Sequence, residues 1–192
     1  NYLWPLLMVV LAPVLLPGVA LRRLHVVAAL LGFAGAAIAI LGARGGTASS
    51  VGADAGYWGF LPALGSAFIW ASYSLWTQRV PAFPTTAIGL FGLLSGALSL
   101  VCHALLEPSV TLSPRDWMLV VLCGLGPLGA AFFFWDLALK RGDARQIGIL
   151  SYLTPLASTA LLMLVTGRAL SWSIALAAVL IISAAVMGTR AR

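Results

Sequence analysis

Apolar residues fill most of this chain in long runs, and charged residues stand almost entirely between the runs. Seven runs reach the roughly 20 residues that a membrane-spanning helix needs. The runs lack the strict alternation that is typical of membrane barrel strands, so the pattern predicts helices. The predicted helices cover residues 2–20, 25–42, 57–77, 85–106, 117–138, 146–166 and 171–188.

The composition excludes a water-soluble domain. Of the 192 residues, 61% are apolar and only 8% are charged, and the mean hydropathy is +1.04. We therefore predict an all-α integral membrane protein whose main surroundings are the lipid bilayer. A net charge of +6 indicates a nucleic-acid partner only where basic residues gather on an exposed domain. The pattern contains no such domain, so we predict no nucleic-acid partner.

The chemistry-bearing residues do not form a catalytic pattern. Cys102 and Cys123 lie inside apolar runs, where we expect small buried hydrophobic side chains rather than a disulfide or a metal pair. The sequence contains no nucleophile with its base, no phosphate-binding loop and no metal-ligand cluster. We predict that the protein is not an enzyme and that it uses no cofactor and no metal.

A short motif occurs twice in the chain. The opening segment Asn1-Tyr2-Leu3-Trp4-Pro5-Leu6 recurs 150 positions later as Ser151-Tyr152-Leu153-Thr154-Pro155-Leu156. In both places a Pro-bearing apolar run is followed by a short turn and a run rich in small residues. The same ungapped offset pairs residues that include Leu11 with Leu161, Ala28 with Ala178, Leu30 with Leu180 and Ala34 with Ala184. Such duplications are the usual construction of secondary transporters.

The second copy ends a series of five predicted helices, whereas the first copy contains only the last two of its series. We therefore expect three further helices before Asn1 and a ten-helix bundle of two five-helix repeats, of which seven helices are present. An odd number of helices in each repeat forces the repeats into opposite orientations. The predicted domains are residues 1–43 for the end of the first repeat, 44–56 for a linker rich in Gly, Ser and Ala, and 57–189 for the complete second repeat.

The basic residues predict the orientation. If the helices alternate in direction, one side carries eight basic residues and the other carries three. The positive-inside rule makes the first side cytoplasmic, and the carboxyl terminus lies on it. The eight residues are Arg22, Arg23, Arg79, Lys140, Arg141, Arg145, Arg190 and Arg192.

Three tryptophans lie away from the expected membrane interfaces. Trp70 is about 20 Å along its helix from Tyr57, which is too deep for an interfacial anchor. Trp4 belongs to a helix that we expect to begin before Asn1, and Trp135 fits either a cavity wall or an inner anchor. We predict that a shared central cavity is lined by Asn1, Tyr2, Trp4, Trp70, Tyr73, Trp135, Tyr152 and Thr154.

Pro5 and Pro155 each remove one backbone hydrogen bond and favour a kink. A packing kink is the simpler interpretation, but its occurrence in both copies beside a tyrosine favours a break that faces the cavity. Asp136 is the carboxylate placed well inside an apolar run, and Lys140 follows at i+4, so a local ion pair and a role in coupling both remain open. His103 lies one turn before Glu107, and we interpret it as interfacial.

Several segments resemble the drug/metabolite transporter superfamily, whose members carry two EamA-type repeats of five helices. The segments are Gly56-Tyr57-Trp58-Gly59, Ala138-Leu139-Lys140-Arg141-Gly142 and Tyr152-Leu153-Thr154-Pro155. The opening motif, together with Phe68-Ile69-Trp70-Ala71-Ser72-Tyr73, is similar to the aromatic amino acid exporter (YddG-like) branch. Many members have Gly-Glu where this chain has Pro17-Gly18 and Gly167-Arg168, which weakens the case for proton coupling.

The resemblance implies an exporter of aromatic and other neutral amino acids in the bacterial inner membrane. It would work by alternating access through a central cavity lined by Tyr2, Trp4 and Trp70. Passive or weakly coupled export is the favoured mode. One alternative is an exporter of other small metabolites or drugs on the same fold, and another is a seven-helix receptor or scaffold. The oligomeric state stays open.

Overall fold

The computed structural model describes residues 2–43, 60–81, 83–167 and 171–191. Within these ranges the regular structure is helical, and no described residue lies in a strand. The chain forms two compact units, which we describe separately. Unit 1 comprises Asn1–Arg79 with Gly142–Arg192, and unit 2 comprises Val80–Arg141. The predicted linker 44–56 and the predicted site residue Asn1 lie outside the described residues.

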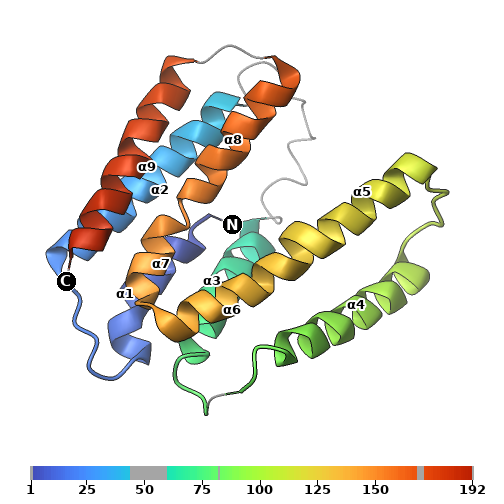
Figure 1. Ribbon diagram of the computed structural model, residues 1–192, viewed down its shortest axis with the longest axis horizontal. Helices are drawn as coiled ribbons and strands as arrows, with labels where there is room; N and C mark the ends of the chain where they lie inside the picture. The colour runs from blue at the N-terminus through green and yellow to red at the C-terminus, as the bar shows by residue number, and fades with distance from the viewer. Residues whose placement is uncertain (1, 44–59, 82, 168–170, 192) are drawn as a thin grey trace. The chain divides into compact units, whose positions relative to one another are not determined.

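Ten helical elements follow one another along the described chain (Figure 1). Unit 1 contains α1 (Trp4–Leu15), α2 (Arg23–Ala43), α3 (Phe60–Trp76), α7 (Ala144–Leu150), α8 (Leu153–Thr166) and α9 (Trp172–Arg190). Unit 2 contains α4 (Ala87–Leu106), α5 (Pro114–Leu125), the π-helix η1 (Gly126–Ala130) and α6 (Ala131–Arg141).

Five helical stretches are long and apolar enough to cross a membrane. They are Arg23–Leu41, Ala87–Leu106, Pro114–Arg141, Ala144–Thr166 and Trp172–Arg190. The two other predicted runs hold the shorter apolar helix α1 and the helix α3. The prediction of an all-helical membrane protein is therefore confirmed for the described residues. The count of seven spans and the ten-helix inverted repeat stay predictions.

Local sequence explains where several helices begin and end. The side chain of Ser113 caps α5 and forms a capping box with Asp116, while Ser171 caps α9. Both side chains satisfy amide groups that have no partner inside the helix. At the other end of a helix, Gly167 adopts a left-handed φ of 65° directly after α8. Glycine accepts this conformation without a Cβ clash.

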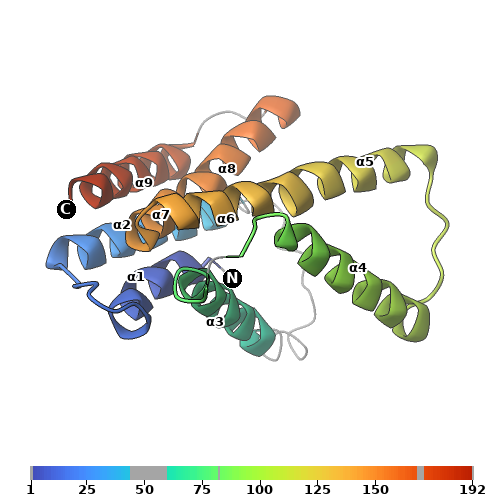
Figure 2. The same ribbon diagram turned by 60° about the horizontal axis from the view of Figure 1, so that its bottom comes forward.

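Unit 2 is built around one long rod in which α5, η1 and α6 continue one another (Figure 2). Pro127 lies in η1, where its missing N–H removes a helical hydrogen bond and the turn widens to the π form. A Cβ on Gly129 would overlap the carbonyl oxygen of Gly124, so this widened turn needs glycine. The helix α4 packs on α6, with Gly89 beside the ring of Phe133.

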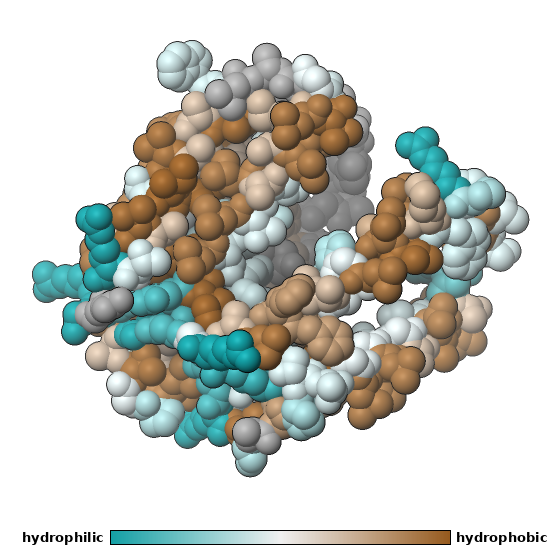
Figure 3. Space-filling model, viewed as in Figure 1, coloured by the Kyte–Doolittle hydropathy of each residue, from teal (hydrophilic) through white to brown (hydrophobic). Residues whose placement is uncertain are grey.

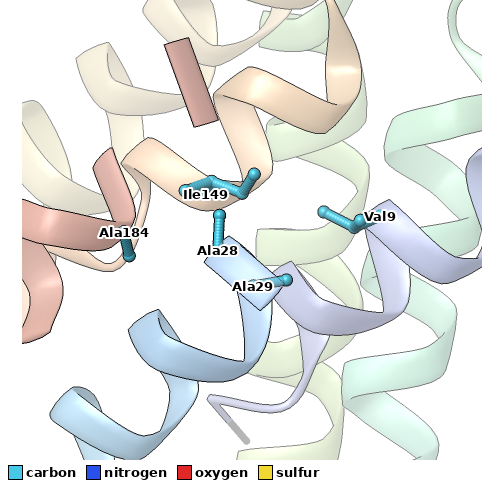
Figure 4. Packing of buried hydrophobic residues seen from close by; sticks show 5 residues of the cluster. All are labelled: Val9, Ala28, Ala29, Ile149 and Ala184. Atoms are coloured by element: carbon cyan, nitrogen blue, oxygen red, sulfur yellow. The ribbon is translucent and has the colours of Figure 1, made fainter. Parts of the chain in front are cut away.

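The core of unit 1 lies where α2 and α9 run side by side in opposite directions (Figures 1 and 2). Small residues allow this close approach, since a Cβ on Gly35 would come within 3.0 Å of the Ala177 carbonyl oxygen. Figure 4 shows side chains of α1, α2, α7 and α9 meeting in one cluster. Its members are Val9, Ala28, Ala29, Ile149 and Ala184.

Burial refines the correspondence between the two copies. Pro5 and Pro155 are both buried, as are Val9 and Thr159, which agrees with an offset of 150 in the Pro-bearing helices. Beyond that helix an offset of 149 fits better. The left-handed glycines Gly18 and Gly167 are 149 apart. The same offset joins five pairs of buried residues of α2 and α9, namely His25/Ile174, Ala28/Ala177, Gly32/Ile181, Gly35/Ala184 and Ala39/Gly188.

The pairings of Ala28 with Ala178 and of Ala34 with Ala184 therefore need correction by one residue. The physical reason is the turn between the two helices. The helix α1 ends at Leu15 and leaves Leu16 and Pro17 before its left-handed glycine, whereas α8 continues directly to Gly167.

Candidate functional site

Three aromatic side chains meet in unit 1, and we call them the aromatic group: Trp4, Trp70 and Tyr73. The ring centroids of Trp4 and Trp70 are 6.3 Å apart at an interplanar angle of 87°. Those of Trp70 and Tyr73 are 5.6 Å apart and tilted by 33°. Edge-to-face and offset arrangements at these distances are favourable because they match the positive edge of one ring with the negative face of another.

The contact between α1 and α3 positions this group. The buried face of α3 consists of Ala67, Ala71, Ser74 and Leu75, in which Ala67, Ala71 and Leu75 recur every four residues. This spacing turns Trp70 and Tyr73 to the edge of the buried face, where both side chains are only partly buried. Trp4, at the first turn of α1, is also partly buried. The group therefore keeps ring surface that is not covered by unit 1.

The two predicted tyrosines of the duplicated motif lie in different surroundings. Tyr2 is 39% exposed at the start of α1, but Tyr152 is completely buried. The ring of Tyr152 lies against Gly32 so closely that a Cβ there would overlap it. Ala36 and Ile181 complete the cluster around this ring. Tyr152 is thus a packed core residue of unit 1, and a role in lining a cavity stays a prediction, as it does for the exposed Thr154.

The second proline motif coincides with an interruption of the helix. The turn at Ser151 and Tyr152 separates α7 from α8. In the first copy Pro5 lies in the first turn of α1, where a missing N–H removes no bond inside the helix. Because Pro155 has no N–H, the carbonyl oxygen of Ser151 accepts a hydrogen bond from the Thr154 N–H instead, at 3.0 Å. The freed carbonyl is therefore satisfied locally.

The break between α7 and α8 lies next to Pro5 of α1. A Cβ on Gly148, just before the break between α7 and α8, would lie 3.2 Å from the Pro5 carbonyl oxygen and 3.3 Å from Met8 Cβ. The absence of a side chain at Gly148 lets the backbone of α7 approach α1 at the level of its own proline.

Trp135 and Asp136 belong to α6 in unit 2. The predicted pair between Asp136 and Lys140 is present, with 2.6 Å between Oδ2 and Nζ. Lys140 also donates to the Phe83 carbonyl oxygen and to Thr85 Oγ1, and it lies 4.2 Å above the Phe83 ring. Asp136 thus supports a lysine that holds the chain segment before α4.

Two other predictions for unit 2 concern His103 and the two cysteines. His103 Nδ1 lies 2.6 Å from Glu107 Oε2, and both side chains are exposed at the end of α4. Cys102 and Cys123 are exposed, so the expectation that they are buried is wrong within this structure. Their helices have few neighbours in unit 2, and such apolar faces suit contact with lipid.

Among the described residues, no group of three or more His, Cys, Asp or Glu could hold a metal ion.

Sequence reasoning missed an interacting set at one end of unit 1. Asp143 caps α7 and pairs with Arg145 at 2.5 Å, and the Arg145 guanidinium also donates to the Ala20 carbonyl oxygen. Burial alone raises the pKa of the Asp143 carboxyl, but the hydrogen bonds and charge of Arg145 lower that pKa overall. The aspartate just before an apolar run was a recognisable cap signal, whereas the carbonyl partner had none.

Comparisons with known proteins agree with this architecture. The profile of the EamA-like transporter family matches residues 57–189. An aromatic amino acid exporter YddG from Ancylobacter novellus is 44% identical over 189 residues, which are 98% of this chain and 64% of that protein. A protein of the same name from Escherichia coli strain K12 is 31% identical over 114 residues, which are 59% of this chain and 38% of that protein.

A crystal structure has a TM-score of 0.86 to this chain at 41% identity, and the match covers 98% of this chain and 64% of the other. The chain thus spans less than two thirds of the length of these relatives. The resemblance found in the sequence motifs is confirmed. The chain belongs to the EamA-like transporter family of the drug/metabolite transporter superfamily, in the branch of the aromatic amino acid exporter YddG.

Proposed function

We propose that this protein exports aromatic and other neutral amino acids across the bacterial inner membrane by alternating access. The observation that carries the proposal is the aromatic group of Trp4, Trp70 and Tyr73. Two relatives named as aromatic amino acid exporters support the substrate class.

The aromatic group suits a flat, apolar side chain. Its rings meet at different angles, so an incoming ring has both a face and an edge to contact. Such contacts contribute about 0.5–1.5 kcal/mol beyond the burial of apolar area. In this proposal smaller neutral amino acids use the same site with fewer ring contacts.

The packing of unit 1 supports alternating access in a ten-helix inverted repeat. The helices α2 and α9 come from different copies, run in opposite directions and bury corresponding residues. Opposite directions are what two inverted repeats require of equivalent helices. In the proposed bundle, residues 1–43 end the first repeat, 44–56 link the repeats and 57–189 form the second. The repeats rock about the break at Pro155 and the adjoining first turn of α1, which holds Pro5.

The orientation of the protein in the membrane is inferred in this proposal from the positions of its arginines. The end of unit 1 that holds the carboxyl-terminal end of α9 also holds Arg22, Arg23, Arg79 and Arg145. By the positive-inside rule this end is cytoplasmic. The aromatic group lies towards the opposite end of α1.

Export in this proposal is passive or weakly coupled. The pairing of Asp136 with Lys140 supports this choice, because it gives this carboxylate a structural role in holding the segment before α4. Proteoliposomes with the purified protein test it. Phenylalanine should equilibrate without accumulating when a proton gradient is imposed. Uphill accumulation driven by the gradient would exclude the passive mode.

Substrate competition tests the proposed function itself. Unlabelled phenylalanine should inhibit the flux of labelled phenylalanine more strongly than threonine does, and organic cations should have no effect. Inhibition by cations alone would favour an exporter of other small molecules. A complete lack of flux would favour the receptor or scaffold alternative, which membership in a transporter family already makes less attractive.

A further inference from the structure

Five helix ends meet at one end of unit 1, which we call the basic end. They are the carboxyl ends of α1, α3 and α9 and the amino ends of α2 and α7, which gather at the lower left of Figure 1. In Figure 3 hydrophilic surface is concentrated there, and the flanks of α8 and α9 are hydrophobic. The arginines of the basic end are Arg22, Arg23, Arg79, Arg145 and Arg190.

Arg145 is held in a fixed orientation at this end. Its Nε donates to Asp143 Oδ1 at 3.0 Å, and its Nη2 donates to Asp143 Oδ2 at 2.5 Å. Asp143 is itself fixed because Oδ1 caps α7 by accepting from the Arg145 backbone N–H at 2.8 Å. The remaining terminal nitrogen, Nη1, donates to the Ala20 carbonyl oxygen. The carboxylate therefore aims the guanidinium at the turn between α1 and α2.

Arg79 makes a second bond of the same kind. It follows α3, and its Nη1 donates to the Leu15 carbonyl oxygen at 3.3 Å. Leu15 is the last residue of α1, where carbonyl groups lack helical partners. Next to Arg79, Gln78 Nε2 donates to the Gly142 carbonyl oxygen at 3.1 Å, which ties α3 to the segment that carries Asp143 and Arg145.

Both arginine bonds join the segment of the first proposed repeat to the segment of the second. Ala20 and Leu15 belong to the pair α1 and α2, whereas Arg145 and Arg79 belong to the five-helix segment that contains α3 and α7. If the two repeats rock against each other, these bonds must break whenever the basic end opens. Bonds within one copy have no such requirement.

A buried histidine lies in the same place. His25, on the first turn of α2, is fully buried, and no described atom meets hydrogen-bond geometry with either of its ring nitrogens. The charged groups that act on its ring are Arg145, Asp143 and Arg22, and the backbone of Ala191 faces it. A polar side chain buried without a full partner costs free energy. Opening of the basic end would admit water to His25 and offset part of the cost of breaking the arginine bonds.

We propose that Arg145, aimed by Asp143 at the Ala20 carbonyl, is the latch that keeps the basic end closed, with Arg79 as its second contact. This inference rests on the proposed function, since a latch matters only if the repeats rock. The latch is weak enough to release. Charge-assisted hydrogen bonds at partly exposed sites shift a two-state equilibrium by about tenfold rather than by many orders of magnitude.

Thiol accessibility tests the latch. The reporter is Ala12→Cys, because Ala12 is fully buried in α1, in a background with Cys102→Ser and Cys123→Ser. A membrane-impermeant maleimide is applied to intact spheroplasts and, separately, to inverted vesicles, so the result does not depend on the assumed orientation. Arg145→Gln should raise the labelling rate about tenfold from the side of the basic end and from that side only.

Matched variants separate the latch from a loss of charge. Arg141→Gln removes one positive charge from an exposed residue of the same connection, and its labelling rate should equal that of the parent. Arg145→Lys keeps the charge but not the two-pronged geometry, so an intermediate rate is expected. Equal labelling rates for Arg145→Gln and Arg141→Gln would overturn the proposal.

If Arg145→Gln fails to fold, Arg79→Gln takes its place, because it breaks the bond to Leu15 and leaves the ion pair intact. Its labelling rate should rise in the same direction by a smaller factor, and an unchanged rate would count against the latch. The labelling needs no substrate. Absence of amino acid flux in the parent would therefore refute the proposed function alone, whereas unchanged labelling with intact flux would refute the latch alone.

Discussion

The two copies of the Tyr-Leu-x-Pro motif share a backbone but not an environment. In each copy a turn precedes a helix with a buried proline. In the first copy Tyr2 is 39% exposed and Trp4 contacts Trp70. In the second copy Tyr152 is fully buried.

The difference shows that the local sequence determines where the chain turns, whereas tertiary contacts determine whether the neighbouring side chains are buried or exposed. Pro155 removes a backbone donor at the break between α7 and α8, and Pro5 occupies the first turn of α1. What happens to the neighbouring tyrosine depends on the helix that faces it. Tyr152 meets Gly32, which has no side chain to keep the ring out. The first copy therefore supplies aromatic surface for a ligand, and the second supplies core packing.

The largest expected effect is on stability. Tyr152→Ala should destabilise the protein by about 3–5 kcal/mol, because it leaves a cavity in a packed core. Tyr2→Ala should cost well under about 1 kcal/mol, since its side chain is substantially exposed. Denaturant unfolding of both variants in the same detergent measures the difference. Similar losses of stability in the two variants would mean that the copies are equivalent and the comparison is wrong.

The next largest effect concerns the residue that makes room for Tyr152. Gly32→Ala should cost about 1–3 kcal/mol, because the new Cβ overlaps the tyrosine ring and forces a shift. The matched control is Gly65→Ala, where a Cβ meets nothing within 4 Å. Thermal unfolding should separate the two variants.

A double-mutant cycle sharpens the same point. If the overlap causes the loss, Gly32→Ala should cost much less when Tyr152 is already Ala. If the stability losses of the two single variants simply add in the double variant, the loss caused by Gly32→Ala arises elsewhere in α2.

The smallest effect is predicted for the second copy in transport. Thr154 occupies the place of Trp4, but its side chain is exposed and its backbone N–H serves the break at Pro155. Thr154→Ala should change the relative flux of phenylalanine and alanine by less than about twofold, because no aromatic contact is lost. A large loss of aromatic preference in Thr154→Ala would mean that Thr154 belongs to the binding surface.

Much of the fold follows from the hydrophobic pattern. Each of the seven predicted runs contains a described helix, because continuous apolar runs of that length have few other ways to satisfy their backbone. The offset of 149 across α2 and α9 could not be predicted, since it depends on how many residues the turn before Gly18 uses. The exposure of Cys102 and Cys123 was also missed, because an apolar run has the same composition against lipid as against protein.

The candidate site was predictable in part. The depth of Trp4 and Trp70 in their runs anticipated that the two rings lie together. The burial of Tyr152 was not foreseen, because it requires the knowledge that Gly32 faces it. The bond from Arg145 to the Ala20 carbonyl joins residues 125 positions apart, and a backbone carbonyl carries no sequence signature.

Substitution of Trp70 shows whether the aromatic group recognises aromatic side chains. The measurement is the ratio of phenylalanine flux to alanine flux in proteoliposomes, for Trp70→Ala and for the control Trp76→Ala, an exposed tryptophan on the same helix. The ratio should fall roughly threefold to tenfold in Trp70→Ala and stay unchanged in Trp76→Ala. An unchanged ratio in Trp70→Ala, with the protein folded and active, would contradict this recognition.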